Sequence, residues 1–330
     1  MDLYEDVVTQ YRNFAADARS SSPTFEDWAS SVADDPEVLA WITTLPLVKQ
    51  QPNIVFAAAR WHGVPAPGGY QSLRDALLGD HGVIRATILT RATQTNEVGR
   101  LATLLPAFGL LAGHEPVALV EVGASAGLCL YPDRYGYRWK TDRGTVALGV
   151  VADAPVLHCD VSGPAPLPDR LPQVTWRDGI DLNPLDVHDT EAMTWLETLV
   201  WPGQDDRRRR LHAAIEVARS DPPHLERGDL LTELPRLVDQ ASAYGPVVVF
   251  HSAVIAYLEV PERAAFDRLM RDLVSAGRCH WVSNEGSKVL PEVTRSGPAA
   301  PEAPATFVLG IDGQAVARAH GHGRRLTWLT

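Results

Sequence analysis

Residues 117–128 read VALVEVGASAGL, an apolar run that carries a carboxylate, Glu121, and breaks into a turn bounded by Gly123 and Gly127. The run predicts a buried β-strand, and the turn predicts a tight loop that leads into a helix. Glycine is common where a side chain would keep the backbone away from a ligand, and a helix N-terminus attracts anionic groups. The stretch therefore predicts a ligand-binding turn at the end of a central strand.

The turn fits two kinds of site. As a nucleotide-binding loop it keeps Glu121, Gly123 and Gly127, with Ser125 in the place of the middle glycine. As G-x-S-x-G it is the nucleophile elbow of a serine hydrolase, with Ser125 as the nucleophile. The motif alone does not decide between these two functions.

Composition narrows the class of protein. The 330 residues carry a formal net charge of -11, which disfavours a nucleic-acid partner because phosphates are bound by basic surfaces. No apolar run approaches the roughly 20 residues of a membrane span, and MDLYEDVVTQYRNF has acids where a signal peptide has basic residues. The three cysteines are isolated, so neither a disulfide framework nor a metal site is predicted. We expect a cytoplasmic protein that binds a small molecule, with no membrane partner.

The pattern of residues 1–112 predicts a helical N-terminal region, which we expect to cover the site as a lid. Its last part includes TQTNEVGR at residues 93–100, a polar segment where a helix would begin. Asn96, Glu97 and Arg100 of this segment are candidates for lining the pocket. Helix capping and a Glu97 to Arg100 ion pair explain the same residues without a ligand.

Strand and helix patterns alternate over residues 113–330, which predicts an α/β domain with a mostly parallel sheet. Short strand-like runs at about residues 135–172 predict a small antiparallel β insertion. The other strand-like runs are residues 174–181, 246–250 and 279–283, and an antiparallel edge hairpin at 306–311 and 314–319 that is followed by a further edge strand at 325–329. Parallel strands end at the same edge of a sheet, and α/β proteins bind ligands at that edge.

Polar residues stand where these strands end. Asp181 closes one strand, as does the acid that binds ribose hydroxyls in nucleotide-binding folds, although the insertion separates it from Gly127 by far more than the usual ~20 residues. Asp229 precedes a helix, where nucleoside-binding folds place a carboxylate for the adenine amino group. Capping of the following turn or helix explains both acids without a ligand. His251 follows a buried strand and is the best-placed titratable group.

The order of these elements resembles the Rossmann-like fold of class I S-adenosylmethionine-dependent methyltransferases. More closely, several segments resemble a bacterial family catalogued as domain of unknown function 2332. These segments are EVGASAGL with the following Asp133-Arg134-Tyr135, TQTNEVGR, GIDLNPLD and Leu199-Val200-Trp201-Pro202. The likeness spans most of the chain and implies the fold, whereas function has to be argued from the site.

The methyltransferase resemblance implies S-adenosylmethionine as the cofactor. It assigns one group of residues to the amino-acid end of the cofactor, one to its ribose and one to its adenine. These residues are Glu121, Gly123, Ser125 and Gly127 for the amino-acid end, Asp181 for the ribose and Asp229 for the adenine. The serine in the middle glycine's place departs from the methyltransferase pattern.

Methyl transfer needs in-line positioning of the sulfonium and a base for the acceptor proton. His251 is the expected base, with Tyr257 and Glu285 as the other candidates. His251-Ser252 stands where many methyltransferases carry an acidic or Asn-Pro motif, which is a second departure from the pattern. The methyl acceptor is not specified by the sequence.

Two alternatives stay open. A non-methylating or binding-only relative would share the sheet and the loop. A hydrolase would need Ser125, an acid and a late histidine, for which His320 or His322 is available. The helical pattern before Ser125 and the glutamate at position 121 favour the nucleotide-binding interpretation, since a nucleophile elbow normally follows several βα units.

Overall fold

The computed structural model describes residues 6–19, 21–151, 154–299 and 306–329. The chain divides into two compact units. The first unit consists of Met1–Thr95 and Thr190–Arg209, and the second consists of Asn96–Asp189 and Arg210–Thr330. Among the described residues, no helix is both long and apolar enough to cross a bilayer.

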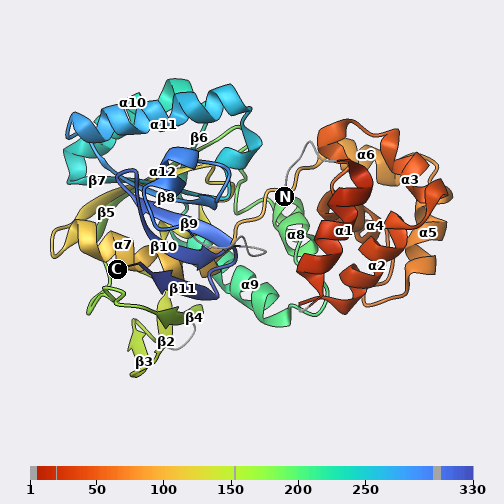
Figure 1. The fold of residues 1–330 in the computed structure, drawn as a ribbon, viewed down its shortest axis with the longest axis horizontal. Coiled ribbons are helices and arrows are strands. Elements are labelled where there is room, and N and C mark those ends of the chain that lie inside the picture. The colour runs from red at the N-terminus through yellow and green to blue at the C-terminus, as the bar shows by residue number, and fades with distance from the viewer. Residues whose placement is uncertain (1–5, 20, 152–153, 300–305, 330) are drawn as a thin grey trace. The chain divides into compact units, whose positions relative to one another are not determined.

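The first unit is built from helices (Figure 1). They are α1 (Val7–Ala18), α2 (Pro23–Ala33), α3 (Pro36–Thr43), η1 (Leu47–Lys49), α4 (Pro52–Trp61), α5 (Tyr70–Leu78), α6 (Val83–Thr90), α8 (Thr190–Thr198) and the start of α9 (Asp205–Ser220). Proline occupies the first turn of α2, α3 and α4, where its missing N–H costs no hydrogen bond. Trp201 packs on Phe14 with ring centroids 4.8 Å apart, which explains why residues 190–209 join the N-terminal helices.

Helix α7 (Leu101–Ala112) belongs to the second unit, although we expected the helical N-terminal region to extend to residue 112. The Phe108 ring of α7 lies 5.2 Å from that of Phe250 in the sheet. Trp139 Nε1 also donates a hydrogen bond to the Ala102 carbonyl at 2.8 Å. The lid position of the helical region stays a prediction.

The second unit is organised around one sheet of eleven strands among the described residues. They are β1 (Val117–Val122), β2 (Gly136–Thr141), β3 (Gly144–Leu148), β4 (Val156–Ser162), β5 (Val174–Asp181), β6 (His224–Arg227), β7 (Val247–Ser252), β8 (His280–Gly286), β9 (Thr306–Ile311), β10 (Gln314–His320) and β11 (Arg325–Trp328). Their order is β3-β2-β4-β11-β10-β9-β8-β7-β1-β5-β6. The expected α/β class with a mostly parallel sheet and additional antiparallel strands is confirmed.

The five strands β6, β5, β1, β7 and β8 are parallel neighbours. β1 lies between β5 and β7, so the chain builds the sheet outward first on one side of β1 and then on the other. β9 runs antiparallel to β8, and β10 runs antiparallel to β9. The carboxyl ends of the parallel strands therefore meet at one edge, on both sides of β1.

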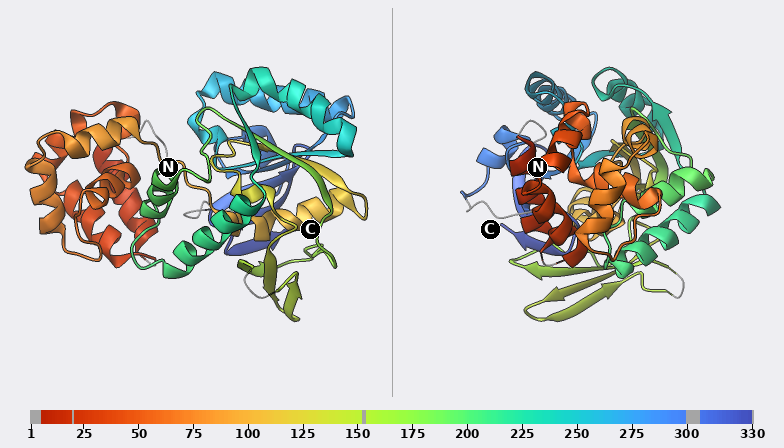
Figure 2. Two further views of the ribbon diagram at one scale, coloured as in Figure 1. Left: turned by 180° about the vertical axis from the view of Figure 1, so that it is seen from behind. Right: turned by 90° about the vertical axis from the view of Figure 1, so that its right-hand side faces the viewer.

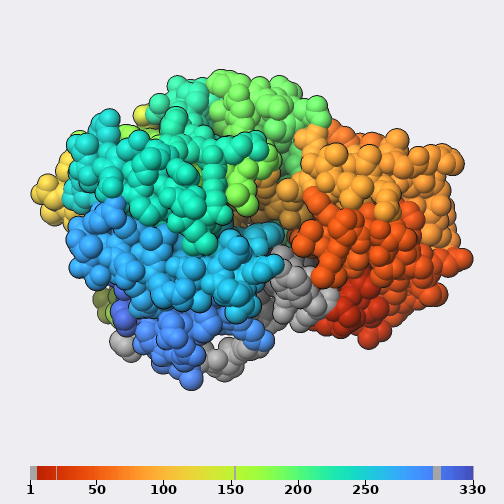
Figure 3. Space-filling model, turned by 90° about the horizontal axis from the view of Figure 1, so that it is seen from above, coloured from red at the N-terminus to blue at the C-terminus, as the bar shows by residue number. Residues whose placement is uncertain are grey.

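Helices cover both faces of this sheet (Figure 1). α10 (Leu230–Ala241) and α11 (Val260–Ser275) lie on one face, where Leu234, Leu237 and Phe266 pack with the buried Val120 and Val122 of β1. α7 lies on the other face. Figure 3 shows the solvent side of α10 and α11, which cover the strands beneath them. Burial from both sides explains the unbroken apolar run of β7, which is typical of parallel strands.

Two features of the sheet differ from the sequence-based expectation. The β insertion is not wholly antiparallel, because β2 pairs parallel with β4 and β4 pairs parallel with β11. The β9–β10 hairpin is not an edge, since β11 and the insertion continue the sheet beyond it (Figure 2). Residues 152–153 of the predicted insertion lie outside the described residues.

Candidate functional site

The turn after β1 is held by left-handed backbone and by the end of β5. Gly123, Ser125 and Gly127 have positive φ angles of 69°, 54° and 69°. The Ser125 N–H donates to Asp181 Oδ2 at 2.9 Å, and the Gly123 N–H donates to the Ile180 carbonyl at 2.8 Å. These bonds join the glycine loop to the carboxyl end of the neighbouring strand.

The α-helix expected after this loop is wrong, because only the 3-10 turn η3 (Leu128–Leu130) follows it. Pro132 comes two residues later, and the residue before a proline is disfavoured in the α conformation. Asn96 Oδ1 accepts a hydrogen bond from the Leu128 N–H at 2.8 Å, which satisfies one donor that a helix would have left open. The N–H groups of residues 123–125, 127 and 128 are therefore bonded within the protein, and no helix N-terminus stands behind the loop.

The two glycines are required by packing inside the protein. A Cβ atom at Gly123 would lie 2.4 Å from the methyl carbons of Val254, and one at Gly127 would lie 2.8 Å from Pro223 Cγ. Both distances are far shorter than any van der Waals contact between carbons. Close approach by neighbouring side chains explains the glycines here, where the sequence suggested close approach by a ligand.

Ser125 meets only part of the nucleophile-elbow geometry. Its backbone is left-handed, but its side chain is buried and only 4% exposed. The hydroxyl has no hydrogen-bond partner among the described residues, which include every histidine of the chain. The histidine that would activate a nucleophile is thus not in place at this hydroxyl.

Three carboxylates lie at the ends of three neighbouring parallel strands. Glu121 is the penultimate residue of β1, Asp181 ends β5, and Asp229 follows β6 by two residues. Asp181 Oδ1 accepts from the Asn183 N–H at 2.7 Å, and Asp229 Oδ1 accepts from the Leu231 N–H at 2.7 Å. Asp181 and Asp229 therefore perform the capping that the sequence allowed.

Glu121 is the buried carboxyl group among these three residues. Burial raises the pKa of its carboxyl well above the ordinary value, nearby Asp181 raises this pKa further, and Arg100 opposes the shift. Cys129, which hydrogen-bonds Glu121, is buried as well, and burial raises the pKa of its thiol. The end of β1 therefore holds a carboxyl group that favours its protonated form.

Residues 96–100 bond to groups of the second unit near the ends of β1 and β7, and their expected role in lining a pocket stays a prediction. Glu97 caps the 3-10 turn η2 (Val98–Arg100) by accepting from the Gly99 N–H at 3.0 Å, so the helix expected near residue 93 begins later, with α7. Arg100 donates from Nε to the Gly321 carbonyl at 2.8 Å and from Nη1 to the Ser252 carbonyl at 2.9 Å. Its guanidinium is buried and lies close enough to Glu121 to lower that pKa.

His251 is fully buried and both of its ring nitrogens are engaged. Trp281 Nε1 donates to His251 Nε2 at 3.0 Å, and His251 Nδ1 lies 2.8 Å from Glu285 Oε1. An indole N–H can only donate, so Nε2 carries no proton and Nδ1 donates to the carboxylate. The lone pair that a general base would use is therefore already occupied.

The two other base candidates differ in access. Glu285 is buried, and its Oε1 also accepts the N–H groups of Val254 and Ile255 at 3.0 and 3.1 Å. These bonds fix the segment that covers Gly123. Tyr257 ends η5 (Ile255–Tyr257), just beyond β7, and its side chain is 56% exposed. Tyr257 is the candidate base that a substrate can reach.

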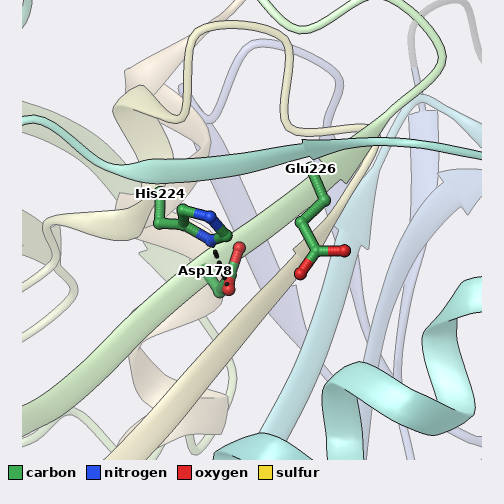
Figure 4. Close-up of side chains that lie close together, drawn as sticks. All are labelled: Asp178, His224 and Glu226. Atoms are coloured by element: carbon green, nitrogen blue, oxygen red, sulfur yellow. Dashed lines mark hydrogen bonds and ion pairs between the residues drawn. The ribbon is translucent and has the colours of Figure 1, made fainter.

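A further cluster, which the sequence did not suggest, joins β5 and β6. Asp178 Oδ2 lies 2.8 Å from His224 Nδ1, and Glu226 lies beside them (Figure 4). Burial raises the pKa of Asp178, and the hydrogen bond from His224 opposes this. The only sequence signal was the His-x-Glu spacing of a short polar strand, which places two side chains on one face.

A family model described as an uncharacterized protein conserved in bacteria, DUF2332, matches residues 8–328. No curated protein and no solved structure matches the chain.

Proposed function

The chain belongs to the DUF2332 family, and we propose that it is an S-adenosylmethionine-dependent methyltransferase-like enzyme that acts on a small molecule. The observation that supports this most is the row of carboxylates, Glu121, Asp181 and Asp229, at the ends of β1, β5 and β6. These strands lie beside the point where the strand order reverses, between β1 and β7. Open α/β sheets bind nucleotides at such a switch point.

The proposed roles follow the positions of these side chains. Asp181 accepts the ribose hydroxyls and Asp229 meets the adenine amino group, while the loop at Gly123 and Gly127 faces the amino-acid end of the cofactor. A carboxylate oxygen can accept more than one hydrogen bond, so the bonds from the Ser125 and Asn183 N–H groups do not by themselves exclude a ribose diol at Asp181. Capping and nucleoside binding are thus compatible at the same side chain.

The proposed catalytic group is Tyr257 rather than His251. The sulfonium is already activated, so the protein has to align the acceptor and receive its proton. His251 Nε2 accepts from Trp281, whereas the Tyr257 side chain is exposed beyond β7. His251 acts in this proposal as a positioning residue, since its partner Glu285 holds the backbone of Val254.

Calorimetric titration with S-adenosylmethionine and S-adenosylhomocysteine tests the proposal. Asp181→Asn should weaken binding by about 1–3 kcal/mol, roughly 5- to 150-fold, because a hydrogen bond to a charged group is replaced by a weaker one. Asp312→Asn is the matched control, since Asp312 also accepts a backbone N–H, from Trp281 at 2.7 Å, but stands in the β9–β10 turn. Unchanged affinity with a lower melting temperature for Asp181→Asn would leave Asp181 a capping residue only.

A second candidate function is a binding protein without methyl transfer. The engaged imidazole of His251 favours it, because the best-placed titratable group of the strand ends is not available as a base. The two functions differ in one readout: an enzyme converts S-adenosylmethionine to S-adenosylhomocysteine in the presence of an acceptor, and Tyr257→Phe slows this conversion. A binding protein retains both ligands unchanged.

A further inference from the structure

The cluster on β5 and β6 has the composition and the spacing of a metal site. Asp178 and His224 are register partners on the two parallel strands, and Glu226 projects from the same face of β6 as His224 (Figure 4). One ligand atom from each side chain lies within 4.8 Å of the other two. Metal–ligand distances of about 2.0–2.2 Å place ligand atoms roughly 3–3.5 Å apart, so small side-chain rotations suffice to close the site.

The three side chains combine a fixed ligand with accessible ones. Asp178 is buried, and its Oδ1 is held by the Gly179 N–H at 2.7 Å, which leaves Oδ2 directed at His224. The His224 side chain is 69% exposed, so an ion bound there keeps positions open to water. One imidazole and two carboxylates suit a first-row dication better than Mg²⁺ or Ca²⁺, which prefer oxygen alone.

The present partners of these residues can be exchanged. Arg236 of α10 forms an ion pair with Glu226 and a second one with Glu233 at 3.2 Å. Arg236 therefore retains an ion-pair partner when Glu226 coordinates a metal ion. Coordination of Nδ1 replaces the hydrogen bond from His224 to Asp178, and the ring proton then resides on Nε2 of the neutral imidazole. We propose that Asp178, His224 and Glu226 bind a first-row divalent metal ion such as Zn²⁺. Because β6 has only four residues and pairs only with β5 among the described strands, the bound ion stabilises the pairing of this edge strand with β5.

Titration of the chelator-treated, dialysed full-length protein with ZnCl₂ tests the site, with calorimetry for affinity and circular dichroism to verify folding. We expect one Zn²⁺ per chain and a rise in melting temperature on binding. His224→Ala, at an exposed side chain, should keep the fold and weaken binding roughly 100-fold, and Glu226→Gln should weaken it at least tenfold.

The matched control is His280→Ala. His280 Nδ1 lies 2.9 Å from Asp312 Oδ2, the same imidazole–carboxylate pair, but it is not part of a three-ligand group among the described residues. This variant should bind Zn²⁺ as the unaltered protein does. A protein that binds no Zn²⁺, or a His224→Ala variant that binds it with unchanged affinity, would overturn the proposal and leave an ordinary His–Asp hydrogen bond at the sheet edge.

Discussion

The imidazole of His251 shows how one residue can look catalytic in sequence and be structural in the fold. Its position at the carboxyl end of β7 is the place for a site residue, but Trp281 and Glu285 engage both ring nitrogens. His251→Ala should lower the free energy of unfolding by about 2–4 kcal/mol, because it leaves a buried indole N–H without an acceptor and takes one of three donors from the buried Glu285 carboxylate. Urea unfolding measures this, with the half-exposed His280→Ala expected to cost less than about 1 kcal/mol. Equal costs for both variants would contradict the structural role.

Glu121 makes stability depend on pH. Its pKa is raised in the folded state by burial, from an ordinary value of 4.5, so the folded chain binds a proton that the unfolded chain releases. The contribution of this group is complete below about pH 4.5 and is lost as the pH rises toward the raised value. Glu121→Gln removes this pH dependence of stability. The melting temperature of the variant, relative to that of the unaltered protein, should therefore be higher at pH 8 than at pH 5. A difference that is the same at both pH values would show that Glu121 ionises freely in the fold.

The glycine loop makes a prediction at the scale of the element. Gly123→Ala adds a Cβ atom 2.4 Å from Val254 at a φ of 69°, whereas Gly277→Ala adds one at a φ of 67° with nothing within 4 Å. The second variant measures the left-handed strain alone, about 1–2 kcal/mol. The first should cost at least about 1–3 kcal/mol more in denaturant unfolding because of overpacking. Adding Val254→Ala to Gly123→Ala should recover most of that excess, and no recovery would mean that Val254 does not set the cost.

Elements with strong local patterns could be predicted from sequence, and the others depended on tertiary contacts. The apolar run of β7 predicts this strand to within two residues of its ends, and Asp229 predicts where α10 begins. β6 was missed because His224-Leu225-Glu226-Arg227 has no apolar run. The α-helix expected after the loop was wrong for three reasons. Ser125 has a left-handed backbone, Pro132 follows closely, and the Leu128 N–H bonds Asn96 Oδ1, a residue far away in sequence.

The same limit applies to the candidate site. Asn96 bonds the Leu128 N–H and Arg100 bonds the Ser252 carbonyl, whereas their expected place in the lining of a ligand pocket stays a prediction. The pairing of His251 with Glu285 spans 34 residues and exists only through the register of β7 against β8. The Asp178–His224 pair likewise depends on the register of β5 against β6. A single sequence indicates where strands with apolar runs end. It does not specify the register between strands, and the register decides which side chains face each other.

At the scale of the whole molecule, the first unit is discontinuous in sequence. Arg60 donates from Nη1 to the carbonyls of Thr198 and Val200 at 2.6 and 2.8 Å. Burial lowers the pKa of Arg60 to about 10, with a smaller contribution from the charge of nearby Arg208. Arg91 also forms an ion pair with Glu191. Residues 190–209 therefore complete a core that the N-terminal helices leave open.

A fragment of residues 1–95 should consequently lack a cooperative thermal transition, because Phe14 loses its contact with Trp201 and Arg60 is left buried without acceptors. Joining residues 190–209 to this fragment by a short Gly-Ser linker should restore cooperative unfolding, since Arg91 and Glu191 already lie side by side. Circular dichroism at rising temperature compares the two chains, and Trp201→Ala in the linked chain should lower its midpoint. If residues 1–95 alone unfold cooperatively at the temperature of the linked chain, α8 and Trp201 are not part of this folding unit, and the division of the chain at residue 95 would be the boundary of an independent domain.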